Sequence, residues 1–258
     1  MRHFVGALKV QVSGWTQVGN QVEIEASKHS NVPLEIYVIV ECKGLLFDMD
    51  GVLISSIASV NRCWRRWAAH YDVPDAENVE IAHGTRAVEI MKGFRPDFTK
   101  EQYVEGLRVI EDMEIADTAD LKVLPGVREL LTSLPSERWT IVTSATRRLL
   151  LGRLKAANLP FPDELIAADD VVNGKPHPEP YMKGAAMLGF TPAECVVVED
   201  APTGVGSGHA AGSRVLGVLG THKAEELYGA GANFVVGSLT GVVVTKDASG
   251  LRLEFEKV

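Results

Sequence analysis

Two aspartates separated by one residue are the strongest candidates for chemistry in this chain. Asp48 and Asp50 follow the apolar run of residues 44–47, and Gly51 comes directly after them. Alternate side chains of a strand share one face, so both carboxylates can project beyond the tip of a strand into one small volume. Carboxylates crowded in this way repel each other unless a cation or a phosphoryl group makes use of them. A solvated turn and a calcium loop are the plain alternatives, but residues 52–54 are apolar and offer no side-chain ligands to calcium.

A second pair of acids follows another apolar run. Glu199 and Asp200 come after the valines at 196–198. Burying acids at the end of an apolar strand is costly unless they are paired or bind a metal. Carboxylates from two strand ends, with no His or Cys at ligand spacing, form a site made only of oxygen. Such a site suits Mg²⁺, a hard cation that usually bridges protein carboxylates to a substrate phosphate.

Two further segments carry groups that could bind an anion. Ser144, Ala145 and Thr146 lie where an expected strand runs into a helix, and the start of a helix offers unpaired N–H groups. Helix capping is the more ordinary role of such hydroxyl residues. Lys175 is followed by prolines on both sides of His177, which stiffen the backbone and hold the ammonium in one direction. We interpret His177 itself as a turn residue, because no second His or Cys lies at ligand spacing.

The elements that must position these groups alternate between strand and helix from residue 42 onward. Short apolar runs separated by helical patterns predict an α/β fold, with a doubly wound, mostly parallel sheet. In such sheets ligands bind at the carboxyl ends of the strands, where each candidate segment lies. The expected strands are residues 43–48, 140–144, 165–167, 196–199, 215–218 and 234–236. The expected helices of this part are residues 127–134, 147–157, 178–188 and 204–211.

Two segments depart from this alternation. Residues 56–123 show only helical patterns, at 61–71, 87–94 and 100–117, and predict a helical cap domain over the ligand end of the sheet. Residues 1–41 predict a β-rich or poorly ordered extension, in which we find no chemistry. The core domain is then formed by residues 42–55 and 124–258, and it closes with a β-hairpin at 242–255.

Composition excludes several classes of protein. The net charge is −8 and no run of Lys or Arg occurs, which argues against a nucleic-acid-binding protein. No apolar run reaches the length of a membrane span, and the start of the chain does not have the order of a secretion signal. Cys42, Cys63 and Cys195 are few and far apart, which favours a reducing compartment without disulfides. We therefore expect a cytoplasmic protein, monomeric or weakly homodimeric.

The order of the candidate groups resembles the four signature motifs of the haloacid dehalogenase superfamily, over about residues 43–240. The matching positions, from the first motif to the fourth, are Asp48 with Asp50 and Gly51, Ser144, Lys175, and Glu199 with Asp200. Within the superfamily the chain is most similar to glycerol-phosphate and 2-deoxyglucose-phosphate phosphatases. This likeness depends on residues 83–86, 124–127 and 174–184. It implies that residues 56–123 are a mobile cap of the C1 type.

The resemblance also implies a role for each motif residue. Asp48 would be the nucleophile that forms an aspartyl-phosphate, and Asp50 would protonate the leaving alkoxide and then deprotonate the attacking water. Mg²⁺ would be bound by Asp48, the backbone carbonyl of Asp50, and Asp200, with Glu199 as a direct or water-mediated ligand. Ser144, the Ala145 amide and Lys175 would hold the non-bridging phosphoryl oxygens.

Further substrate contacts are expected from the first and second motifs and from a loop of the cap. They are Gly51, Ala145, Thr146, His83, Gly84 and Arg86. The guanidinium of Arg86 would clamp hydroxyls or phosphate, or close the cap onto the core; a surface arginine at a helix start is the plain alternative.

The function implied is a Mg²⁺-dependent phosphomonoester hydrolase that acts on a small phosphorylated metabolite, a sugar or polyol phosphate of the glycerol 3-phosphate or hexose phosphate type. A phosphotransferase like β-phosphoglucomutase is the main alternative, because it shares the fold, the four motifs and the cap. A non-catalytic binding module is a remote alternative, since the motif residues are all present.

Overall fold

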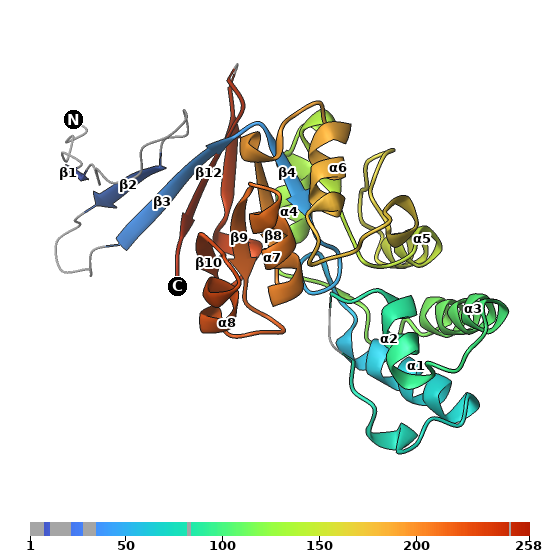
Figure 1. Ribbon diagram of the computed structural model, residues 1–258. Helices are drawn as coiled ribbons and strands as arrows, with labels where there is room; N and C mark the ends of the chain where they lie inside the picture. The colour runs from blue at the N-terminus through green and yellow to red at the C-terminus, as the bar shows by residue number, and fades with distance from the viewer. Residues whose placement is uncertain (1–7, 11–21, 28–34, 82–83, 248) are drawn as a thin grey trace.

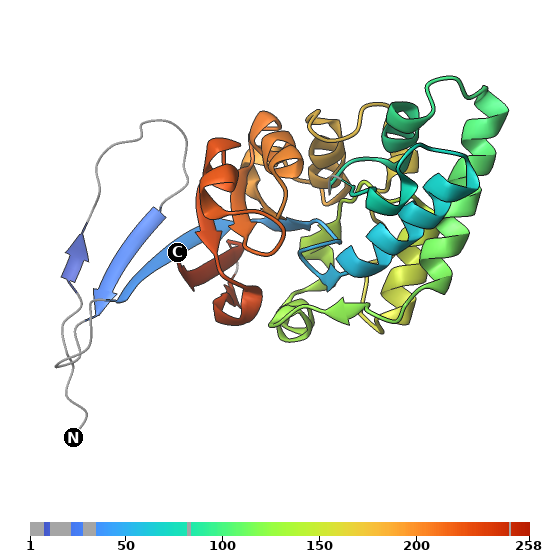
Figure 2. The same cartoon turned by 90° about the horizontal axis from the view of Figure 1, so that it is seen from below.

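The computed structural model describes residues 8–10, 22–27, 35–81, 84–247 and 249–258. Figure 1 shows three parts: an α/β body in the middle, a helical block at one end, and an antiparallel sheet that extends from the other end. The view from below shows the same three parts in a row (Figure 2). None of the helices in the described ranges is long and apolar enough to cross a bilayer.

The α/β body is built on a five-stranded parallel sheet with the order β10-β9-β8-β4-β7. β4 lies between β8 and β7, and residues Leu45 to Phe47 pair with both neighbours. β4 and β8 are buried along their whole length, which explains why their residues up to Val198 are apolar without alternation. The strands are β4 (Gly44–Phe47), β7 (Trp139–Ile141), β8 (Cys195–Glu199), β9 (Arg214–Val218) and β10 (Phe234–Val236).

Helices cover both faces of this sheet. Successive residues of β4 belong to different cores: Leu45 and Phe47 pack with α4 and α5, whereas Leu46 packs with α6, α7 and α8. The helices are α4 (Val127–Ser133), α5 (Arg147–Ala156), α6 (Glu179–Met187), α7 (Pro202–Ala210) and α8 (Ala224–Gly229). The predicted doubly wound α/β fold is confirmed. One expected strand is wrong, because residues 165–167 form only an isolated bridge, between Ile166 and Val142.

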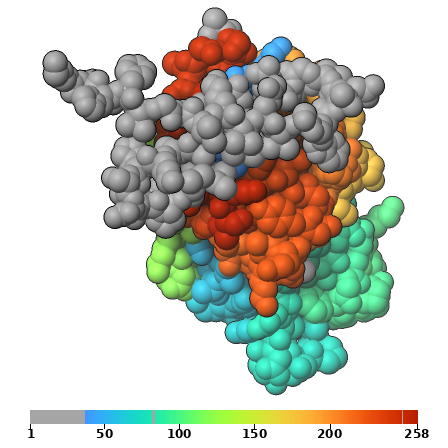
Figure 3. All heavy atoms as spheres, turned by 90° about the vertical axis from the view of Figure 1, so that its left-hand side faces the viewer, coloured from blue at the N-terminus to red at the C-terminus, as the bar shows by residue number. Residues whose placement is uncertain are grey.

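The helical block contains α1 (Ile57–His70), α2 (Ala87–Phe94) and α3 (Lys100–Ala116), which pack around Trp64, Trp67 and Ile110. Thr99 and Gln102 form a capping box that begins α3. At the base of the block, β5 (Ile54–Ser55) pairs antiparallel with β6 (Lys122–Val123). The sequence indicated only helices between 56 and 123, because a two-residue strand is too short to show a period. In Figure 3 the block protrudes below the α/β body.

The third part is an antiparallel sheet with the order β1-β2-β3-β12-β11. Its strands are β1 (Leu8–Val10), β2 (Val22–Ser27), β3 (Glu35–Cys42), β11 (Val243–Lys246) and β12 (Leu251–Glu256). The expected C-terminal hairpin is confirmed as β11 and β12, and β12 pairs with β3 over six residues. Only Lys43 separates β3 from β4, so this sheet continues directly into the centre of the α/β body.

Candidate active site

Three carboxylates meet where β4 and β8 end. Ligand oxygens of Asp48, Glu199 and Asp200 lie within 4.8 Å of one another, and all three residues are buried. The parallel pairing of β4 with β8 causes this meeting, because the Asp48 N–H still donates to the Val198 carbonyl (3.0 Å) one step beyond the strand. Residues about 150 positions apart are therefore brought to one edge of the sheet, as the two apolar runs predicted.

Two glycines leave room for these carboxylates. Gly51 has φ +88°, and a Cβ on it would lie 1.9 Å from Asp200 Oδ2. A Cβ on Gly204 would lie 1.6 Å from Glu199 Oε1. Neither position can hold a larger residue without moving an acid. Gly51 was predicted to contact substrate, but in the structure it packs against Asp200 and does not line the cavity described below.

One buried ammonium connects two of the acids. Lys175 Nζ donates to Asp48 Oδ1 (2.5 Å), to Glu199 Oε1 (2.8 Å) and to the Val142 carbonyl (3.0 Å). The Tyr181 hydroxyl donates to the same Glu199 oxygen at 3.0 Å. The other Glu199 oxygen accepts two backbone N–H groups, so the carboxylate of Glu199 is held on both sides. These contacts indicate that Glu199 orients Lys175.

The acids carry more negative charge than Lys175 balances. Burial raises the pKa of the Asp48 carboxyl, and the Lys175 ammonium opposes this only in part. Burial also raises the pKa of Asp200, and the charges of Glu199 and Asp48 raise it further. A divalent cation would offset this repulsion, and an all-oxygen donor set fits a hard cation. The residues present therefore fit a divalent metal.

The Asp50 carboxylate does not belong to the cluster of three acids and is bonded to other groups. Its Oδ1 accepts a hydrogen bond from Ser56 Oγ (2.6 Å), and its Oδ2 accepts one from Arg153 Nη1 (2.7 Å). The Asp50 side chain can therefore have a different role from that of Asp48. Only the backbone carbonyl of Asp50 is predicted to bind metal. The contact with Arg153 was not expected, because nothing in the sequence of α5 distinguishes this arginine from its neighbours.

The predicted anion-binding segment lies at the end of β7. Ser144 Oγ donates to the Gly84 carbonyl (2.7 Å), which links the α/β body to the loop before α2. The Ala145 N–H is 3.1 Å from Thr143 Oγ1. Thr146 caps α5 by accepting the Leu149 N–H, and its hydroxyl also bonds to Glu111 of α3. Thr146 is therefore observed as an ordinary helix cap.

Arg86, which ends the loop before α2, forms a second link between the helical block and the α/β body and does not line the cavity described below. Arg86 Nη1 donates to the Val172 carbonyl (3.1 Å), and its Nη2 lies 3.0 Å from Glu89 Oε1. The stem of Arg86 covers Gly174, where a Cβ would lie 2.7 Å from Arg86 Nε. Arg86 thus joins the helical block to the segment that carries Lys175. His83 lies outside the described residues.

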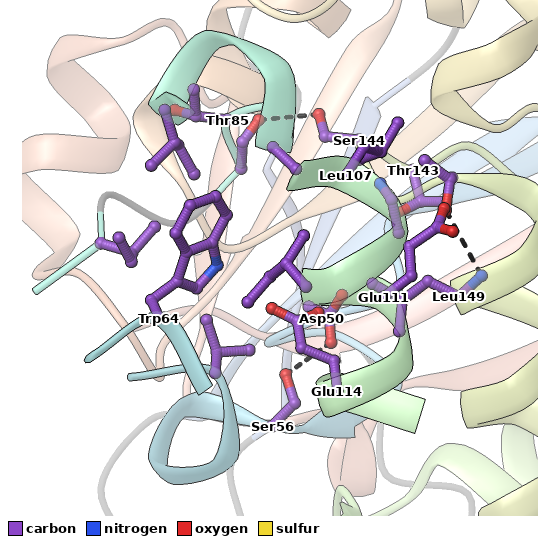
Figure 4. A pocket seen from close by; sticks show the side chains of 18 of the residues that line it. Asp50, Ser56, Trp64, Thr85, Leu107, Glu111, Glu114, Thr143, Ser144 and Leu149 are labelled. Carbon is purple, nitrogen blue, oxygen red and sulfur yellow. Dashed lines mark hydrogen bonds between the residues drawn. The ribbon is translucent and has the colours of Figure 1, made fainter. Parts of the chain in front are cut away.

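A cavity of about 80 Å³ separates the helical block from the carboxyl end of the sheet. Figure 4 shows Asp50, Ser56 and Glu114 at one end of it and Thr85 and Ser144 at the other. The described residues of α1 to α3 that line it are mainly apolar, and no Lys, Arg or His is among the described lining residues. From the helical block the lining includes Trp64, Ile81, Ala87, Ile90, Leu107, Ile110, Glu111 and Glu114.

A carboxylate of α6 orders the chain just before Lys175. Glu179 accepts the backbone N–H groups of Val172 (3.0 Å) and Asn173 (2.9 Å), and Lys183 Nζ lies 2.9 Å from it. These N–H groups and the Lys183 ammonium lower the pKa of Glu179 from 4.5 to about 2. A lowered pKa in the folded state stabilises the protein above pH 4.5, and this contribution is lost as the pH falls towards 2.

We therefore expect Glu179→Gln to lower the melting temperature at pH 7, and the difference from wild type to shrink progressively below pH 4.5. Thermal unfolding followed by circular dichroism between pH 7 and pH 3 measures this. A difference of the same size at pH 3 as at pH 7 would contradict the assignment of the effect to the charge of Glu179.

Comparison with known proteins decides the family. A model of the haloacid dehalogenase-like hydrolases matches residues 42–212. The chain belongs to this family. Hexitol phosphatase A of Escherichia coli K12 is 37% identical over 214 residues, which are 81% of this chain and 97% of that protein. Glycerol-1-phosphate phosphohydrolase 1 of Saccharomyces cerevisiae is 37% identical over 202 residues, 74% of this chain and 80% of that protein.

A solved structure of a hydrolase from Pseudomonas syringae has the same fold. It superimposes with a TM-score of 0.67 at 26% identity and covers 77% of this chain and 94% of its own. The resemblance to the haloacid dehalogenase superfamily, predicted from the four motifs, is confirmed. This chain is accordingly a phosphomonoester hydrolase of the haloacid dehalogenase family. The family generally uses a divalent metal, and the three acids could hold one.

Proposed function

We propose that this haloacid dehalogenase-like hydrolase removes phosphate from small sugar or polyol phosphates with the help of Mg²⁺. The observation that supports this most is the contact of Lys175 with Asp48 and Glu199, directly beside Asp200, at the carboxyl end of one parallel sheet. The substrate class is taken from the named relatives, which act on hexitol and glycerol phosphates.

Asp48 is the nucleophile in this proposal. Its carboxylate attacks phosphorus, the bond to the leaving alkoxide breaks, and water then hydrolyses the aspartyl-phosphate. Lys175 binds Asp48 and favours its ionised form, and in this proposal one of its N–H groups turns to a phosphoryl oxygen when substrate binds. Ser144 Oγ and the Ala145 N–H, which in the structure donate to the Gly84 carbonyl and to Thr143 Oγ1, would turn to the remaining oxygens when substrate binds. Bound by Asp48, Asp200 and the backbone carbonyl of Asp50, Mg²⁺ would supply positive charge that balances the phosphoryl oxygens.

Asp50 moves the protons. It lines the cavity, whereas Glu199 and Asp200 do not, so it faces the space that the leaving group would occupy. It gives its proton to the leaving alkoxide in the first step and takes one from the attacking water in the second. Glu199, whose oxygens are engaged by Lys175, Tyr181 and two backbone N–H groups, is a water-mediated metal ligand or an orienting group.

The chemistry of the cavity favours a phosphatase over a phosphoglucomutase-like phosphotransferase. Such a transferase must hold a bisphosphate, so its cap needs a cation for the second phosphate group. The described lining carries carboxylates, hydroxyls and apolar side chains and no cation, and Arg86 is engaged by Val172 and Glu89 outside it. An uncharged polyol or sugar fits this lining better. A binding module without chemistry is disfavoured, since no motif residue has been lost.

We also propose that residues 56–123 act as a cap on the core formed by 42–55 and 124–258, with Gly84 and Arg86 as the contacts that close it. Residues 1–41 form an N-terminal extension in this proposal, and its strand β3 pairs with β12 of the core. Three free, buried cysteines support a cytoplasmic location. We expect a monomer or weak homodimer whose partner is a small phosphorylated metabolite rather than nucleic acid or a membrane.

A comparison of two reactions tests the proposed function. We expect phosphate release from glycerol 3-phosphate or hexose and hexitol 6-phosphates in the presence of Mg²⁺, abolished by EDTA and restored by added Mg²⁺. β-Glucose 1-phosphate with a bisphosphate primer provides the test of the transferase. Substantial isomer formation with little free phosphate would overturn the phosphatase proposal, and activity unaffected by EDTA would overturn the role of the metal.

A further inference from the structure

A buried chain of charges connects the helical block to Asp50. Arg153 of α5 donates from Nη1 to Asp50 Oδ2 (2.7 Å) and from Nη2 to Glu114 Oε2 (2.9 Å). The side chains of Arg153 and Glu114 are 5% and 6% exposed, so solvent screens this pair little. Glu114 belongs to α3, and Asp50 belongs to the first motif. One guanidinium therefore bonds to two carboxylates from different parts of the molecule.

The geometry of a guanidinium makes this contact directional. Arg153 is a planar fork, and each of its two terminal nitrogens bonds to a different acid, so the position of Glu114 fixes the plane in which Asp50 is held. A buried arginine that loses one of two acidic partners is left partly uncompensated, and it then reorients or admits water. Separation of α3 from α5 would have this effect, because it removes Glu114.

A second ion pair between the same two helices has no contact with Asp50 among the described residues. Arg148 of α5 lies 3.2 Å from Glu111 of α3 and also pairs with Asp112. The Arg148 side chain is 51% exposed, and no contact of Arg148 with Asp50 is found among the described residues. Two kinds of link between α3 and α5 are therefore present: one at the surface and one that ends on the proposed acid–base group.

We propose that Arg153 is a positioning residue for Asp50, and that Glu114 sets its orientation only while α3 is docked on α5. The inference rests on the proposed function, because it requires Asp50 to transfer protons. Arg153 holds Oδ2, so Oδ1, which also accepts a hydrogen bond from Ser56 Oγ, is the oxygen that gives a proton to the leaving alkoxide oxygen. The carboxylate that results stays paired with the guanidinium. Docking of the helical block thus orients Asp50 for proton transfer, through Glu114 and Arg153, in addition to covering the substrate.

The test compares leaving groups, because only a poor leaving group needs the acid. In Arg153→Lys and Glu114→Gln we expect turnover of glycerol 3-phosphate to fall by about 10- to 100-fold, below the ~10²–10⁴-fold that general acid–base catalysis contributes. The first-turnover burst of nitrophenolate from 4-nitrophenyl phosphate should stay within about threefold of wild type, since this leaving group departs without a proton. Rapid-quench and stopped-flow measurements give both values.

Arg148→Gln is the matched control, because it removes an ion pair between the same two helices without touching the chain to Asp50. It should leave the ratio of the two rates unchanged. In an Asp50→Asn background, Arg153→Lys should add no further loss with glycerol 3-phosphate, since its effect acts through Asp50. Glu114→Gln serves as the test if Arg153→Lys does not fold.

Three outcomes would count against the proposal. Equal losses with both substrates would show a merely structural role for Arg153 and Glu114, and wild-type rates in both variants would show no role. Additive losses in the Asp50→Asn background would show that Arg153 acts elsewhere. A wild-type protein that releases phosphate from neither substrate would instead overturn the proposed function itself, so the two failures are distinguishable.

Discussion

Asp48→Asn is expected to reduce phosphate release to background. The carboxamide cannot attack phosphorus, and loss of a catalytic nucleophile costs on the order of 10⁶-fold in turnover. The structure adds a second reason, because Asp48 Oδ1 lies 2.5 Å from Lys175 Nζ and the substitution removes one of the charges that hold this ammonium. Steady-state release of phosphate from glycerol 3-phosphate measures the effect, with 4-nitrophenyl phosphate as a second substrate.

Asp163→Asn provides the matched control, since it makes the same chemical change at an exposed position of the α/β body. It should keep wild-type activity. Because an asparagine can deamidate to aspartate, Asp48→Ala should be measured beside Asp48→Asn, and both should show no aspartyl-phosphate after rapid quench. Full activity of either variant in a folded protein would remove Asp48 from the mechanism.

Asp50→Asn is expected to reduce turnover of alkyl phosphates by ~10²–10⁴-fold, the usual contribution of general acid–base catalysis. Asn retains the size of the side chain but can neither give nor take the proton. The burst of nitrophenolate from 4-nitrophenyl phosphate should change much less. Deprotonation of the attacking water is also lost, so aspartyl-phosphate should accumulate in this variant and be detectable as protein-bound phosphate.

Ser56→Ala serves as the control for Asp50, because it removes the hydrogen bond to Oδ1 and leaves the carboxylate and Arg153 in place. Its loss of activity should be smaller than that of Asp50→Asn. Equal slowing of alkyl and nitrophenyl phosphates by Asp50→Asn would mean that Asp50 acts on the nucleophile or the metal and not on the leaving group.

The predictions from sequence succeeded where the signal is local. The buried strands β4 and β8 are apolar up to the acids, which lie at the end of β8 (Glu199) and directly after both strands (Asp48 and Asp200), so the pattern of residues predicted both the sheet and the edge at which the acids meet. Helices α4 to α7 lie within two residues of the expected ranges, whereas α8 was not among the expected helices. The family was also predictable, since the four motifs occur in order along the chain.

They failed where the signal is short or distant. The pairing of β5 with β6 involves two residues on each side, and residues 165–167 look like a strand but form a single bridge. The pairing of β3 with β12 joins segments about 210 positions apart, and a pattern of apolar residues along one strand does not indicate which distant strand it pairs with. The expectation that Arg86 contacts substrate or closes the cap stays a prediction, and only the structure gives Val172 as its partner.

The amino-acid sequence alone determined the fold class, the family and the acids and lysine that meet at the sheet edge, because apolar periodicity and motif spacing are properties of neighbouring residues. Only the tertiary structure decided which groups surround Asp50. Arg153 and Glu114 lie on different helices, and a helical pattern shows that a face is buried but not which element covers it. The control of Asp50 by α3 is therefore a property of packing that sequence patterns do not encode.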